Sequence, residues 1–179
     1  MVSMADKRQA LLDLIQQLAT AQGVPFAKTR FRADDLLLGA SANLDRAAIL
    51  GRPISYLRVS WVGAPDSIPD SGAPTTNWQG QQTQVPHSFR VVIKLEYEHA
   101  EAYEDSSQYR FDRLLEGTDN PEGLLPYFRR APAIEIGGQV CELSRPQDLA
   151  IPTLPEPIEP PRLYAHYAEF TITITSSII

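Results

Sequence analysis

Cysteine is almost absent from this sequence of 179 residues, which contains only Cys141. A single thiol excludes a disulfide within the chain and any zinc site built on several cysteines, and it fits a reducing compartment. Cys141 alternates with Val140 and Glu142 in a predicted strand. This pattern is more typical of a small buried apolar residue than of a reactive thiolate.

Long apolar runs and recognisable catalytic motifs are also missing. The opening stretch MVSMADKRQALLDLIQQLATAQG has charges before its apolar positions, which are spaced rather than continuous. We therefore expect neither a signal peptide nor a membrane-spanning helix. The sequence contains no GxSxG, no GxGxxG, no phosphate-binding loop and no paired zinc-ligand spacing. These absences predict a protein that is not an enzyme and that binds no cofactor.

Lysine is scarce, because only three of the 16 basic residues are lysines and the others are arginines. The formal net charge of −6 argues against a dedicated binder of nucleic acid or of anionic membranes. The preference for arginine suits bidentate contacts with protein carboxylates. It is equally consistent with a GC-rich genome, and the sequence leaves both interpretations open.

The densest polar cluster is EYEHAEAYED, residues 96–105. His99 with Glu96 or Glu101 would offer imidazole and carboxylate ligands to a metal ion. However, the cluster crosses from a strand end into a helix start, where carboxylates are favourable without any metal. We therefore expect a solvated helix cap and no metal site.

Apolar periodicity predicts an α+β fold for the whole chain, residues 1–179, taken as one domain. Spacings of three and four residues predict a helix over 5–21, stopped by Gly23, and a second helix over 100–117. Alternating apolar residues predict strands, with a glycine turn inside the hairpin, over 54–62, 88–98, 133–137, 139–143 and 163–176. These strands would form one mostly antiparallel, mixed sheet with the two main helices packed on one face.

Two long segments lack this periodicity. Residues 63–87 are rich in Pro, Gly, Ser, Thr and Gln, and a loop of this length is usually functional or disordered. Trp78 in its middle indicates a loop that docks on a partner. Residues 144–162 carry six prolines and predict a stiff extended strap that cannot join a central ladder, because proline has no N–H.

The stretch YFRRAP places Tyr127, Phe128, Arg129 and Arg130 side by side, after a short helix that we expect to break near Pro126. This basic and aromatic patch would contact nucleic acid or the carboxylates of a partner. Alternatively, the arginines are solvated and stabilise the end of the helix. The negative net charge favours a protein partner over nucleic acid.

The closing stretch LYAHYAEFTITITSSII predicts a long final strand whose even-numbered residues face the core. Its threonines suit a semi-exposed second face. We expect the overhang TSSII, with Ile178 and Ile179, to dock a neighbouring subunit or to fray.

The order of these elements resembles the tail terminator, or tail completion, proteins of tailed bacteriophages and related neck proteins of contractile tails. The likeness covers most of residues 5–175. It rests on RQALLDLIQQLATAQGV, on FRVVIKLEYEHA running into EDSSQYRFDRLLEG, on IEIGGQVCEL and on YAEFTITIT. The long 63–87 loop and the 144–162 strap depart from the pattern of the family.

The resemblance implies a small α+β subunit without catalytic residues that forms a hexameric ring in the virion tail or neck, assembled in the host cytoplasm. Such a ring caps the tail tube at its head-proximal end and meets the tube protein, the sheath and the connector or stopper proteins. Nucleic acid would be met only through the lumen of the ring.

Two other interpretations stay open. One is another virion subunit of the same fold, such as a head-tail stopper or a baseplate adaptor. The other is a small-molecule-binding or hydrolytic domain in which the 63–87 loop, with Trp61 and Trp78, forms a lid over the 96–105 carboxylates.

Overall fold

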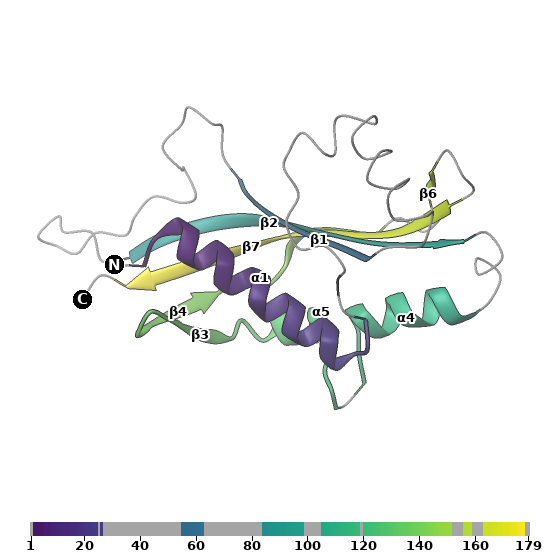
Figure 1. Ribbon diagram of the computed structural model, residues 1–179. Coiled ribbons are helices and arrows are strands. Elements are labelled where there is room, and N and C mark those ends of the chain that lie inside the picture. Colours follow the sequence, from purple (N-terminus) through teal and green to yellow (C-terminus); the bar gives the residue numbers. More distant parts are fainter. Residues whose placement is uncertain are drawn as a thin grey trace, which may run out of the picture.

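The computed structural model describes residues 2–24, 26, 55–62, 84–98, 105–118, 120–151, 156–158 and 163–177. Three helices and seven strands lie in these segments and confirm the predicted α+β class (Figure 1). In chain order they are α1 (Met4–Ala21), β1 (Ser55–Trp61), β2 (Gln84–Glu98), α4 (Asp105–Leu115), α5 (Leu124–Arg129), β3 (Ala133–Ile136), β4 (Gln139–Leu143), β5 (Gln147–Ala150), β6 (Glu156–Ile158) and β7 (Leu163–Ser177).

The seven strands form one sheet in the order β1-β2-β7-β4-β3, and β5 and β6 also pair with β7. Every pairing between these strands is antiparallel. The hairpin between β3 and β4 turns at Gly137 and Gly138, whose φ angles of 56° and 79° suit a type I′ turn. The predicted hairpin is therefore confirmed.

The strands β2 and β7 pair along their full length, from Gln84 opposite Ser177 to Glu98 opposite Leu163. On its other side β7 pairs with β4, β5 and β6 in turn. The prediction of an overhang is wrong for Thr175–Ser177, because β2 pairs with all three residues and β4 pairs with Thr175 and Ser176. Ile178 and Ile179 lie outside the described residues.

The core lies on one face of the sheet. Phe89, Val91 and Ile93 of β2 are fully buried, as are the even-numbered residues of β7 from Ala168 to Ile174. Figure 1 shows α1, α4 and α5 on the same side of the sheet. Their buried side chains complete the core and include Leu11, Leu12, Ile15, Phe111, Leu114, Leu124, Leu125 and Phe128. The prediction of helices packed on one face is confirmed, with α5 as an addition.

The two segments predicted as loop and strap are partly strand. Gln84–His87 belong to β2, so the 63–87 boundary is wrong at its end, while residues 63–83, with Trp78, lie outside the described residues. Within 144–162, β5 and β6 both pair with β7. The strap prediction is wrong here because β5 contains no proline, and the single Pro157 of β6 lies in a short outer strand where proline is tolerated.

Pro126 does not break the short helix. It is the third residue of α5, which runs on to Arg129. The N–H groups of a first helical turn have no partner inside the helix, so proline removes no hydrogen bond there. The predicted break was therefore wrong.

The connection between α4 and α5 brings two glycine backbones together. A Cβ atom on Gly117 would lie 2.1 Å from the backbone nitrogen of Gly123, and the φ of Gly117 is 73°. Both the backbone conformation and the space therefore exclude a larger residue at Gly117. The tight connection fixes how the two helices share the core.

We predict that Gly117→Ala lowers the free energy of unfolding by about 2–4 kcal/mol, because it combines a left-handed backbone with a backbone clash. Urea denaturation measures the change. The matched control is Gly138→Asn, which has a similar φ but open space around its Cβ and should cost under about 1 kcal/mol. Equal losses in the two variants would contradict the assignment.

Candidate functional site

The structure separates the four residues of the predicted basic and aromatic patch. Phe128 is fully buried, with its ring centroid 5.5 Å from that of Tyr127 and 6.0 Å from that of Phe170. The prediction of Phe128 as an interface residue is therefore wrong, because its face of α5 packs into the core. Tyr127 is half-buried, and Arg129 and Arg130 are exposed.

Both arginines of the patch have carboxylate partners within the chain. Arg130 forms an ion pair with Glu122, and its guanidinium lies 5.6 Å from the centroid of the Tyr127 ring. Arg129 lies 3.5 Å from a carboxylate oxygen of Glu116. The positive charge of the patch is thus partly compensated, which weakens the case for nucleic acid at this place.

The two described histidines lie far apart. His87 is opposite Ile174 and His166 is opposite Leu95, so they are separated by eight residues along β2, roughly 27 Å at about 3.4 Å per residue. His166 stacks on Phe111 at 5.1 Å between ring centroids. The two imidazoles therefore cannot act at one catalytic centre. Residues 99–104 of the acidic cluster lie outside the described part of the chain.

Within the described segments, no group of three His, Cys, Asp or Glu side chains is placed to hold a metal ion. The helices of the same segments include none that is long and apolar enough to cross a membrane.

A buried lysine joins the start of α1 to the sheet. Lys7 is 0% exposed, and its Nζ donates to the carbonyl oxygens of Val85 at 2.6 Å and Ile174 at 3.3 Å. A third contact, of 3.1 Å, reaches Nδ1 of His87. An ammonium group has three protons, and these three acceptors match them.

Burial sets the protonation of this cluster. It lowers the pKa of Lys7 and the pKa of His87, and it raises the pKa of the Cys141 thiol. A neutral His87 accepts the Lys7 proton at Nδ1 only if its own proton is on Nε2, which assigns the tautomer. Cys141 is fully buried, as its sequence pattern predicted, and it stays a thiol. We assign the cluster a positioning role, in which it holds α1 against β2 and β7.

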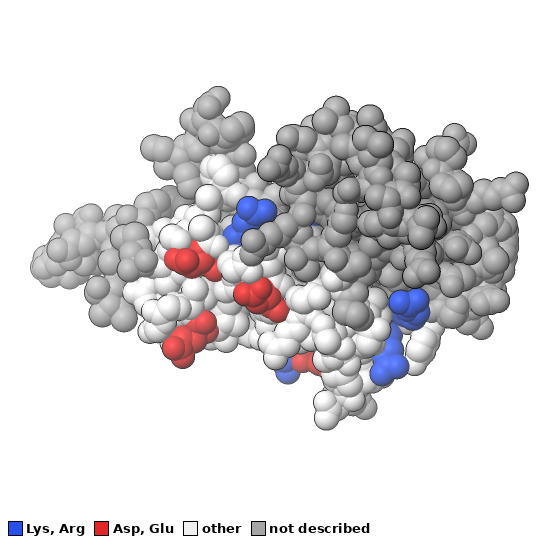
Figure 2. Space-filling view, in the orientation of Figure 1, with Lys and Arg blue, Asp and Glu red and all other residues white. Residues whose placement is uncertain are grey.

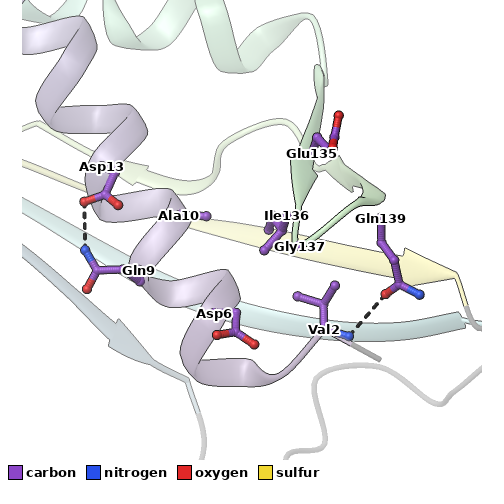
Figure 3. A pocket seen from close by; sticks show the side chains of 9 residues that line it. All are labelled: Val2, Asp6, Gln9, Ala10, Asp13, Glu135, Ile136, Gly137 and Gln139. Atoms are coloured by element: carbon purple, nitrogen blue, oxygen red, sulfur yellow. Dashed lines mark hydrogen bonds between the residues drawn. The ribbon is translucent and has the colours of Figure 1, made fainter.

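An open groove lies beside this anchored helix. It has a volume of about 560 Å³ and lies between the first half of α1 and the hairpin of β3 and β4 (Figure 3). Its floor includes the apolar residues Val2, Ala10 and Ile136. The backbone N–H of Val2 donates to Gln139 Oε1 at 3.2 Å, and this hydrogen bond ties the start of the chain to the hairpin.

The walls of the groove are acidic. Asp6 and Asp13 come from α1 and Glu135 comes from β3. Ser3 donates to Asp6 from its backbone N–H at 3.1 Å and from its hydroxyl at 2.6 Å, and these bonds keep the pKa of Asp6 below its usual value. Figure 2 shows acidic side chains gathered over this end of the molecule, around the start of α1 and the hairpin. The groove therefore presents negative charge at neutral pH.

Sequence reasoning missed both the buried lysine and the groove. Lys7 precedes Leu11 by four residues, so it continues the apolar stripe of the helix, and that position was the signal for its burial. Asp6 and Asp13 are seven residues apart, which places them on one helix face. Nothing in the sequence pairs either of them with Glu135.

Comparisons with known proteins add little. No protein-family model and no curated protein matches the sequence. One solved structure, known only by a sequence identifier, aligns with a TM-score of 0.46 and 10% identity, over 100% of this chain and 98% of the other. At this level of similarity the match carries no argument about function.

The contact between Lys7 and His87 should make the stability of the protein depend on pH. Folding lowers the pKa of His87, so near the usual pKa of a histidine the unfolded chain binds more protons than the folded chain. The free energy of unfolding should therefore fall as the pH drops from about 7.5 to 5.5. His166 contributes in the same direction, since burial also lowers its pKa. We predict that His87→Asn, whose amide oxygen can still accept from Lys7, reduces this loss of stability.

Urea denaturation of both proteins at the two pH values measures the difference. His166→Gln measures the contribution of the second imidazole: it leaves Lys7 and its three contacts unchanged and should also reduce the loss of stability. The same pH dependence in wild type and His87→Asn would contradict the assignment.

Proposed function

We propose that this chain is a structural, non-catalytic subunit of a phage-like tail. In this proposal it acts as a tail terminator, forms a ring that caps the head-proximal end of the tail tube and joins the tube to the neck. The observation that carries the proposal is the order of the folded elements. It runs from an opening helix α1 through the long strand β2, the helix α4 and the hairpin to the closing strand β7.

A ring subunit that ends a tube must keep its shape while neighbours contact it on several sides. The fifteen residue pairs between β2 and β7 provide a stiff platform for this purpose. Helices cover one face of the platform. The other face carries the Arg90–Glu169 ion pair and the hydrogen bond between Ser88 and Thr173, at 2.8 Å. A face of this polar kind is stable in water and still suits contact with another subunit.

The proposed partners are further copies of the chain, in a hexameric ring, and the tail tube protein. Sheath and connector or stopper proteins would contact the ring from its outer sides. The place of action is the tail or neck of the virion, after assembly in the host cytoplasm. A ring of this kind closes by head-to-tail contacts between different surfaces of the same subunit.

We predict that the purified protein forms closed rings, either alone or on tube subunits. Native mass spectrometry and negative-stain images of the protein, with and without the tube protein of the same particle, test this. Addition of the protein should also stop further polymerisation of the tube.

A protein that stays monomeric at high concentration and binds no tube subunit would overturn the proposal. A protein that forms rings but does not bind the tube end would instead indicate a stopper or an adaptor. Tubes that elongate in the absence of this protein serve as the control for tube length.

A further inference from the structure

We propose that the groove between α1 and the hairpin is a docking site for an extended segment of a partner protein that carries arginine or lysine. The segment would add to the sheet as a strand beside β3. This inference goes beyond the proposed ring and does not depend on it, because it rests on the edge of the sheet and on the residues of the groove.

β3 lies at one end of the sheet. It is the last strand in the order β1-β2-β7-β4-β3, and no other described strand pairs with its outer side. An edge strand of this kind presents backbone N–H and C=O groups that can accept another strand. The outer side of β3 is therefore one of the two ends, with β1, at which this order of described strands can be extended.

Some backbone groups of β3 point outward, away from β4. The two-residue turn makes Ile136 and Gln139 a hydrogen-bonded pair, and the backbone N–H of Leu143 donates to the Pro132 carbonyl oxygen at 2.9 Å. Hydrogen-bonded and non-hydrogen-bonded pairs alternate in an antiparallel ladder. The N–H and C=O groups of Ala133 and Glu135 therefore point away from β4.

The end of β3 also lines the acidic groove. Glu135 and Ile136 project to opposite faces of β3, yet both line the same groove. The groove thus borders both the end of β3 and the turn at Gly137, opposite the first turns of α1 (Figure 3). A strand placed there would have the helix on one side and the free edge of β3 on the other.

The side chains that line the groove indicate the chemistry of its occupant. Three carboxylates, those of Asp6, Asp13 and Glu135, border an apolar floor, and none of the described residues that line the groove is basic. A segment with alternating basic and apolar residues satisfies both features, because successive side chains of a strand point to opposite sides. A second copy of this chain is a less suitable source, since each copy carries a formal charge of −6.

The test uses the full chain and a fluorescein-labelled synthetic peptide of alternating arginine and valine. Fluorescence anisotropy in about 50 mM salt measures the affinity. The variant Asp13→Asn with Glu135→Gln removes two groove charges and leaves the Ser3–Asp6 cap of α1 intact. We expect its Kd to rise roughly tenfold.

A matched control removes two exposed charges elsewhere, through Glu142→Gln with Asp148→Asn. Neither residue lines the groove, and Asn suits the positive φ of 51° at Asp148. We expect less than about a twofold change in Kd. The same peptide methylated on alternate backbone nitrogens keeps its charge but loses strand pairing, and should bind roughly tenfold more weakly.

Equal weakening in the two double variants would overturn the proposal in favour of unspecific attraction. Equal binding of the methylated peptide would overturn the added strand, and the absence of saturable binding up to about 1 mM would overturn the site. Light scattering of the peptide-free proteins completes the test. If the groove variant alone changes the oligomeric state, a second copy fills the groove and the partner proposed here is wrong.

Discussion

The pairing of β7 on both of its sides is the constraint on which the described structure depends. One side is occupied by β2 along its full length, and the other side is shared by β4, β5 and β6. Of the other six described strands, only β1 and β3 do not pair with β7: β1 pairs with β2, and β3 pairs with β4. The alternation along β7 therefore fixes which residues of its neighbours face the core, because a shift of one residue would turn every apolar side chain outward.

Through the buried Lys7, the position of α1 depends on the register of the sheet. The Lys7 ammonium group bonds to carbonyl oxygens of β2 and β7, the two strands that form the long ladder. A charge buried without a carboxylate is costly, and three acceptors offset this cost by replacing the water that the ammonium group loses. The register of β2 against β7 thus determines where α1 lies, and with it one wall of the acidic groove.

The groove and the closed strand β7 change where an interface is expected. The closing strand has no unpaired end at Thr175–Ser177, because β2 pairs with all three residues and β4 pairs with Thr175 and Ser176. Among the described strands, β3 offers an unpaired edge instead, beside the carboxylates of α1. The polar outer face of the β2–β7 ladder and this acidic edge are different surfaces, so the proposed ring contacts and the proposed docking segment would not compete for one place.

The sequence by itself determined the elements with strong periodicity: α1, α4, most of β2, the hairpin and β7. It did not determine β5 and β6, because each is too short to show a pattern and is a strand only through its pairing with β7. It placed Phe128 in a surface patch, since only packing showed which face of α5 turns inward. The acidic groove was decided by the tertiary structure alone, because Asp6 and Asp13 meet Glu135 only when α1 is anchored beside an edge strand more than a hundred residues away along the chain.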